Sequence, residues 1–489
     1  MFRRLLGYAA YMFMTGALTS LLSFAVDAFG MVTRPKESYG DYHIYVLILN
    51  IGVGLFISGP NGAIQRFGAN NEKQRKALAS LILKVFLILL LLTSVIGLVV
   101  GFVYRWNIAL SFFGVPWLVI FWMSRYIARS QLNAKYEGWL LATGSLSKTI
   151  FIGAFLGLSE HPDAMIFGDV IALFAAGLIS LVVLRLSMET SLSELLRVPI
   201  PREFIREFLV FARPLWIGGQ VFLASQEFMG LFTTTVPWLG RTAMASMGVL
   251  RTFWQVTFKP MDFISQAALP TLIIDEDGRK KLYEDLLRLS LIVFSALGLV
   301  TAGAGGLILE LFSLRQKYVE VPALMIIQAA AVPIYVVHMT MSQYTIAEDY
   351  PRYTLYANIA SIIGNAASVY PLSLYFGLNG VVVSAAIGFL FSAMTFLYCL
   401  RNTHRDEVLV SARSGTRMFF ALIVSLAPVY YFRWAEDNWR LIFPSLLIFT
   451  VLTRASNFWS WSDINKGFRL VKAAIRDRGQ KNESSTPST

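Results

Sequence analysis

Long apolar runs recur along the whole chain, and they constrain the fold more than any other feature. A run of roughly 20 apolar residues is what an α-helix needs to cross the hydrocarbon core of a bilayer. The runs are joined by short polar connections, and about fourteen such spans fit between Leu5 and Thr453. Only 15% of the residues are charged and 56% are hydrophobic, which is too apolar for a soluble protein of several domains. The sequence therefore predicts an all-α integral membrane protein and excludes a sizeable soluble catalytic domain.

The spans group into two halves of six helices, followed by an extra pair. The division rests on a polar stretch near residues 187–206, which separates the sixth span from the seventh. The expected segments are an N-lobe at 1–184 (helices 1–6), a cytoplasmic linker at 185–207, a C-lobe at 208–400 (helices 7–12), helices 13–14 at 401–455, and a cytoplasmic amphipathic tail with a disordered end at 456–489.

The basic residues indicate how the chain is oriented. When the N-terminus is placed in the cytoplasm and the spans alternate, most of the 42 Lys and Arg residues fall in cytoplasmic segments, Arg125 and Arg129 among them. Enrichment of Lys and Arg in cytoplasmic loops is the usual pattern in membrane proteins. The sequence therefore predicts that both termini are cytoplasmic, and the net charge of +12 needs no nucleic-acid partner.

Ionisable side chains inside the spans carry the functional argument, because a charge within a bilayer is costly unless it faces protein or water. The polar side chains expected inside spans seven and eight are Arg213, Gln220, Glu227, Arg251, Lys259 and Asp262. These two helices run antiparallel, so Glu227 and Arg251 lie at one depth and Arg213 and Asp262 at another. Each pair is either an interhelical ion pair or a set of side chains that lines a cavity, and the sequence leaves both readings open.

The first half carries a comparable set of polar groups within or beside its spans. These residues are Asp27, Asn61, Arg66, Lys148 and Asp169. Lys148 and Asp169 stand on spans five and six, where a mutual ion pair is the alternative to a role in the interior. On span eleven, Asn358 and Asn365 are predicted to form hydrogen bonds between helices.

Signatures of enzymes and metal centres are weak in this sequence. The four histidines have no metal-ligand spacing, and neither a phosphate-binding loop of the Walker type nor a nucleophile elbow is present. The single cysteine, Cys399, excludes an internal disulfide and a cysteine metal cluster. We therefore expect no enzymatic activity, no metal site and no cofactor.

Several short motifs resemble those of a known family. They are Tyr39-Gly40-Asp41-Tyr42, Gly62-Ala63-Ile64-Gln65-Arg66-Phe67, Phe211-Ala212-Arg213-Pro214-Leu215, Ile308-Leu309-Glu310-Leu311-Phe312 and Gly377-Leu378-Asn379-Gly380-Val381. Together they resemble the polysaccharide biosynthesis flippases (Wzx-type O-antigen and exopolysaccharide transporters) of the multidrug/oligosaccharidyl-lipid/polysaccharide exporter (MOP) superfamily.

The resemblance implies two six-helix lobes around a cationic central cavity in a bacterial inner membrane. By alternating access, such a protein moves a polyprenyl-diphosphate-linked oligosaccharide from the inner to the outer leaflet. A diphosphate crossing a low-dielectric region needs fixed cations. The candidate substrate-binding cations are Arg66, Lys148, Arg251 and Lys259. The candidate cavity or gating residues are Asp27, Asn61, Asp169, Arg213, Gln220, Glu227 and Asp262.

The resemblance also implies partners, and two other classes of protein stay open. The expected partners are the lipid-linked glycan and membrane lipids, with a polysaccharide polymerase and a chain-length regulator as further ones. One alternative is a multidrug or small-solute antiporter of the same superfamily, in which acidic residues such as Asp27, Asp169 and Glu227 would dominate the site. The other is an integral membrane glycan polymerase or ligase, which usually needs a larger outer loop than this sequence offers.

Overall fold

The computed structural model describes residues 2–58, 60–68, 72–131, 133–254, 272, 278–348, 350–431, 438–456 and 458. Within these ranges the regular structure is helical and contains no strand, so the predicted all-α fold is confirmed. The helices are α1 (Phe2–Thr33), α2 (Lys36–Ile57), α3 (Pro60–Gly68), α4 (Glu72–Val103), α5 (Trp106–Ser130), α6 (Ala134–Leu158), α7 (Ala164–Met188), α8 (Leu192–Arg197), α9 (Arg202–Thr235), α11 (Arg279–Leu311), α12 (Val321–Ala347), α13 (Pro351–Phe376), α14 (Leu378–Leu400), α15 (Arg405–Tyr431), η1 (Asn438–Leu441) and α16 (Ile442–Ala455). A further helical stretch covers residues 240–254.

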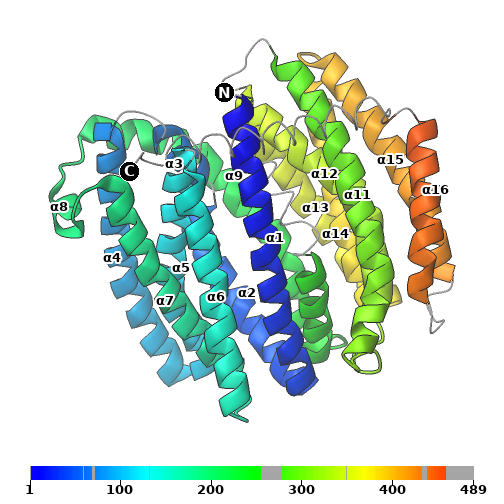
Figure 1. Cartoon of the computed structure of the whole chain (residues 1–489), viewed down its shortest axis with the longest axis horizontal. Helices are drawn as coiled ribbons and strands as arrows, with labels where there is room; N and C mark the ends of the chain where they lie inside the picture. The colour runs from blue at the N-terminus through cyan, green and yellow to red at the C-terminus, as the bar shows by residue number, and fades with distance from the viewer. Residues whose placement is uncertain are drawn as a thin grey trace, which may run out of the picture.

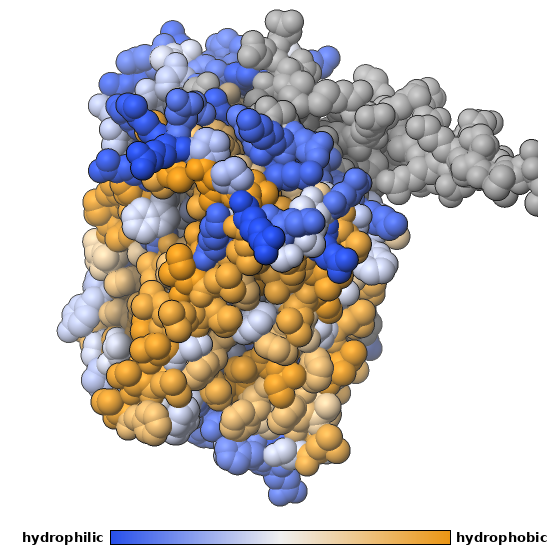
Figure 2. All heavy atoms as spheres, turned by 90° about the vertical axis from the view of Figure 1, so that its left-hand side faces the viewer, coloured by the Kyte–Doolittle hydropathy of each residue, from blue (hydrophilic) through white to orange (hydrophobic). Residues whose placement is uncertain are grey.

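Eleven of the described helices are long and apolar enough to cross a membrane, judged by length and composition. The three other predicted spans fall on α9, on residues 240–254 with the chain beyond them, and on the shorter α16. Figure 2 shows a broad apolar belt between two hydrophilic ends on the side of the molecule formed by α4 and its neighbours. These features establish a multi-pass membrane protein.

The long helices form two groups that meet near α1, α2 and α9. In Figure 1, α4 to α7 lie on one side of the molecule, whereas α11, α12, α15 and α16 lie on the other. We call the end that carries the connection between α1 and α2 the predicted outer end. The opposite end carries α3 and α8, and we call it the predicted inner end.

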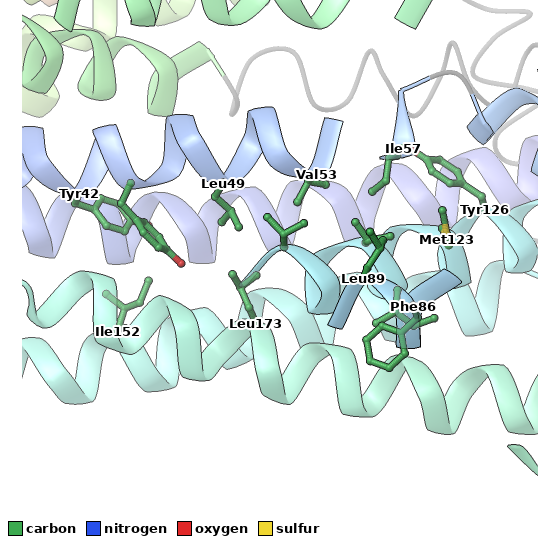
Figure 3. Close-up of a cluster of buried hydrophobic side chains, with 14 of the residues drawn as sticks. Tyr42, Leu49, Val53, Ile57, Phe86, Leu89, Met123, Tyr126, Ile152 and Leu173 are labelled. Atoms are coloured by element: carbon green, nitrogen blue, oxygen red, sulfur yellow. The ribbon is translucent and has the colours of Figure 1, made fainter. Parts of the chain in front are cut away.

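The first hydrophobic core belongs mainly to α1 to α7. Figure 3 shows the side chains of Leu49 and Val53 on α2 among those of the neighbouring helices, including Leu173 on α7 and Met123 on α5. This core also includes Tyr318, between α11 and α12, and other side chains from the predicted outer end of the second half. The two halves therefore share buried apolar contacts at that end.

The second hydrophobic core lies within α11 to α16. It includes Leu291 on α11, Val336 on α12, Phe396 on α14 and Leu422 on α15. The C-terminal pair α15 and α16 packs on α11, and α15 also packs on α12. The last two apolar helices are thus attached to the second half only, as far as the described residues show.

The segment between the halves is shorter than the predicted linker at 185–207. Helix α7 continues to Met188, and α9 already begins at Arg202 directly after Pro201. Between them, Ser191 and Glu194 form a capping box that starts the short helix α8. Most of the predicted tail at 456–489 lies outside the described residues.

Candidate functional site

In the first half, Lys148 on α6 forms an ion pair with Asp169 on α7. The Lys148 Nζ and the Asp169 Oδ1 are 3.0 Å apart, and the two side chains are 35% and 0% exposed, respectively. The helices approach closely at this level because Gly168 packs on the backbone of Ile152. The ion pair that the sequence allowed is therefore present, with the Asp169 side chain buried and the Lys148 side chain partly exposed.

In the second half, Arg251 in the helical stretch 240–254 forms an ion pair with Glu227 on α9. Its two terminal nitrogens donate to the two Glu227 oxygens at 3.3 and 2.9 Å, the bidentate geometry that arginine favours. The Arg251 side chain is 36% exposed, whereas that of Glu227 is only 7% exposed. The antiparallel arrangement inferred from the sequence thus brings these two residues together, again with the cation on the more exposed side.

The two ion pairs lie in one electrostatic neighbourhood. The charges of Asp169, Asp27 and Arg251 all act on Lys148, and both Arg251 and Lys148 act on His43 of α2. Asp27 on α1 accepts a hydrogen bond of 3.0 Å from the hydroxyl of Thr252, the residue after Arg251. Elements far apart in the sequence therefore place their charges around the same part of α2.

We refer to Asp27, Lys148, Asp169, Glu227 and Arg251 as the central charge cluster. Its three carboxylates stand within about two turns of helix ends that lie at the predicted outer end. The cluster therefore lies in the predicted outer half of the membrane-spanning region. It contains two cations and three acids, which come from α1, α6, α7, α9 and the helical stretch 240–254.

Three of the other predicted site residues lie near the predicted inner end. Arg66 on α3 is exposed, and its guanidinium stands 4.5 Å from the centre of the Phe211 ring on α9. Asn61 lies at the start of α3, where its side-chain oxygen accepts from the Gly62 backbone N–H at 2.7 Å. Arg213 is an exposed residue of α9. Both helices reach the predicted inner end here, so these residues are separate from the central charge cluster.

Gln220 on α9 supports the backbone of α2 where that helix ends. Its side-chain nitrogen donates to the carbonyl oxygens of Gly54, Leu55 and Ser58 at 3.1, 3.3 and 3.4 Å. The Trp216 indole also donates to Leu55 O, at 2.8 Å. Carbonyls in the last turn of a helix lack partners within the helix, so Gln220 performs a structural role that its polarity alone did not reveal.

Two predicted residues, Lys259 and Asp262, lie outside the described residues. The proposed pairing of Arg213 with Asp262 is therefore not tested, and neither is the role of Lys259 as a substrate-binding cation. Within the described part of the chain, no group of three or more His, Cys, Asp and Glu side chains is arranged to hold a metal ion.

Polar contacts join the two halves at the predicted outer end. Lys36 at the start of α2 and Glu320 before α12 form an ion pair at 3.0 Å, and Ser246 also donates to Glu320. The Lys317 ammonium donates to the backbone oxygens of Met31 and Arg34 at 2.6 and 2.5 Å. The halves are thus joined on the outer side of the central charge cluster.

Sequence reasoning missed one buried charge network. Arg125 and Arg129 on α5 both contact the Glu137 carboxylate on α6, and all three side chains are at most 2% exposed. The Arg125 guanidinium also lies 4.3 Å from the Trp122 ring centre. The two arginines had been assigned to a cytoplasmic segment. A signal was available in the sequence: the two arginines are one helical turn apart, and the next helix has an acid, Glu137, in its first turn.

Solved structures share this fold at low sequence identity. A structure of MATE in complex with MaL6 matches with a TM-score of 0.62 at 14% identity, over 84% of this chain and 97% of that chain. The lipid II flippase MurJ, in an inward closed conformation, matches with a TM-score of 0.62 at 13% identity, over 90% of this chain and 97% of that chain. A MOP superfamily transporter from Pyrococcus furiosus matches with a TM-score of 0.61 at 14% identity, over 86% of this chain and 96% of that chain.

At these identities the likeness shows only that this chain shares its fold with these proteins. No family model and no curated protein matches the sequence. The choice of substrate must therefore be argued from the side chains of this chain itself.

Proposed function

We propose that the protein is a flippase that carries a polyprenyl-diphosphate-linked oligosaccharide, such as a polysaccharide or O-antigen repeat unit, across a bacterial inner membrane by alternating access. The observation that supports this most directly is the polarity of the two ion pairs. In each pair the cation is about one-third exposed, whereas the acid is buried at 0% or 7%. The more exposed side of these two ion pairs is therefore positively charged.

A diphosphate head group fits this arrangement. It carries several negative charges and needs strong donors once it leaves water. Lys148 comes from the first half and Arg251 from the second, and the charge of Arg251 acts on Lys148, so we expect one head group to contact both lobes. Such a ligand would couple its own binding to the relative position of the two lobes, which alternating access requires.

The remaining predicted residues take secondary roles in this proposal. We assign Arg66 and Arg213, which are exposed near the predicted inner end, to the first contact with the head group at the cytoplasmic face. Both termini are then cytoplasmic, and the lobes at 1–184 and 208–400 move against each other. A polysaccharide polymerase and a chain-length regulator would receive the product in the outer leaflet.

A multidrug or small-solute transporter is the second candidate. It is favoured by the half-buried carboxylate of Asp27 within the central charge cluster and by the likeness to MATE. A cationic solute would need an accessible acid, and Asp27 is the most accessible acid of the cluster. We propose a carrier rather than a polymerase or ligase, because the compared proteins are transporters and a flippase.

Ligand binding to the purified full-length protein in lipid nanodiscs separates the two candidates. A short-chain polyprenyl-diphosphate oligosaccharide should bind, whereas a lipophilic cation should not compete with it. Lys148→Gln and Arg251→Gln should each weaken binding about tenfold to a hundredfold, since hydrogen bonds to charged groups contribute about 1.5–3 kcal/mol. Lys280→Gln is the matched control, because Lys280 pairs with Asp406 at an exposed site. Competition by the cation, with loss of its binding in Asp27→Asn, would instead support the multidrug candidate.

A further inference from the structure

We propose that Asp169 and Glu227 are resident counter-ions that compete with the substrate's diphosphate for Lys148 and Arg251. By this competition they set how tightly the substrate is held and how readily it is released. The inference rests on the proposed function, because it concerns the same site. It gives a role to the two buried acids. The binding of an anion would not by itself require these acids.

In the first ion pair, Asp169 has less freedom to move than Lys148. Asp169 is fully buried, next to the point where Gly168 contacts the backbone of Ile152. Its carboxylate therefore has little freedom to move. Lys148 carries its ammonium on a flexible four-carbon stem and is 35% exposed. A phosphate oxygen can approach the ammonium from the exposed side while the carboxylate stays behind it.

The second pair has the same polarity with a different cation. Glu227 is 7% exposed and receives two hydrogen bonds from Arg251, which is 36% exposed. A guanidinium has five N–H donors, so the donors that Glu227 does not use remain for a phosphate. Both halves of the chain thus present a cation whose charge is already balanced from the buried side.

Charge balance gives the functional consequence. Without substrate, the formal charges of the two pairs sum to zero. When a diphosphate binds, the carboxylates repel it while the cations attract it. Removing one carboxylate charge leaves a net positive site. At roughly 7 Å and an effective dielectric constant of about 20, the lost repulsion corresponds to an affinity gain of at least about tenfold. Release should slow in proportion, because the carboxylate no longer recaptures the cation.

The test measures affinity and turnover on the same full-length variants. Binding of a short-chain polyprenyl-diphosphate oligosaccharide is measured in nanodiscs, and its transfer between leaflets is measured in proteoliposomes. Asp169→Asn and Glu227→Gln should each bind at least about tenfold more tightly than the wild type and turn over more slowly at saturating substrate. Asp406→Asn, which alters an exposed pair with Lys280, should change neither quantity.

A second test exchanges the two charges of one ion pair, and it applies if a single variant fails to fold. The double variant Lys148→Asp with Asp169→Lys retains an ion pair but reverses which charge is exposed. We expect it to lose diphosphate binding while its thermal stability stays nearer the wild type than that of Lys148→Asp alone. If the pair served packing only, the exchanged protein would keep wild-type affinity, and that result would overturn the proposal.

The outcomes also separate the two levels of the argument. Wild-type protein that does not bind the diphosphate lipid would refute the proposed function itself. Wild-type protein that binds, with Asp169→Asn and Glu227→Gln binding equally or more weakly, would overturn the counter-ion role alone. Tighter binding with faster turnover would also contradict it, because the carboxylates would then not promote release.

Discussion

The close packing beside Asp169 can be disturbed by a single methyl group at Gly168. A Cβ on Gly168 would lie 2.6 Å from the Cα of Ile152 and 2.9 Å from both Ile152 N and Phe151 O. Ordinary contacts begin at 3.4 Å, and backbone atoms cannot rotate away, so α6 and α7 would have to separate by about 0.8 Å in a tightly packed interior. Over-packing of this kind costs about 1–3 kcal/mol.

Gly168→Ala should therefore lower the midpoint of thermal unfolding by about 1–3 °C. It should also weaken binding of the diphosphate lipid, because Lys148 lies one helical turn before Ile152 on α6 and faces the same neighbour. Both effects are measured on protein purified in one detergent, by a fluorescence melting curve and by ligand binding. The variant thus links packing between two helices to the geometry of the central charge cluster.

Gly153→Ala is the matched control on α6. A Cβ at Gly153 meets nothing within 4 Å, and alanine favours a helix over glycine by roughly 1 kcal/mol. This variant should melt at or slightly above the wild-type temperature and bind normally. If Gly168→Ala melted as high as Gly153→Ala, the proposed close approach of α6 and α7 would be incorrect.

Three further predictions concern other parts of the molecule. Glu137→Gln should destabilise the protein by about 3–5 kcal/mol, because it leaves Arg125 and Arg129 without their buried carboxylate; a normal yield of folded protein would contradict this. Gln220→Leu should increase hydrogen exchange at the end of α2, where the carbonyls of Gly54, Leu55 and Ser58 lose the donor that they share; unchanged exchange there would count against the capping role. Burial alone would raise the pKa of Glu320, but the hydrogen bonds from Ser246 and Lys36 lower it overall from its ordinary value of 4.5. Its contribution to joining the halves at the predicted outer end is therefore complete above pH 4.5 and lost as the pH falls through the lowered pKa. The accessibility of a cysteine introduced at that end should rise in acid, and Glu320→Gln should abolish this pH dependence; a pH response that persists in Glu320→Gln would contradict the assignment.

The sequence predicted those features that follow from local periodicity. Apolar runs indicated the helices, and antiparallel neighbours at equal depth placed Glu227 opposite Arg251, which the structure shows as an ion pair. Asn358 and Asn365 were predicted to bond between helices, and they do so with Gly218 O and the Ser384 hydroxyl. Glu227 and Arg251 could be paired because they lie on adjacent spans. The two asparagines could be recognised because each is a polar side chain within an apolar span.

Contacts that depend on how the two halves dock could not be predicted. Lys36 and Glu320 are 284 residues apart in the chain, and no periodic pattern relates them. Gln220 was recognised as polar, but its carbonyl partners become available only because α2 ends beside it. The burial of Arg125 and Arg129 against Glu137 could not be predicted, because arginines at the end of a span give the same sequence pattern whether they reach water or a buried acid.

Transfer of a fluorescent polyprenyl-diphosphate oligosaccharide between the leaflets of proteoliposomes tests the central claim most directly. We predict that the wild-type protein accelerates transfer of the diphosphate-linked lipid but not of the same glycan on an uncharged polyprenyl carrier. We also predict that the acceleration is lost in the double variant Lys148→Gln with Arg251→Gln. Equal transfer of charged and uncharged lipids, or full activity of this double variant, would contradict the account.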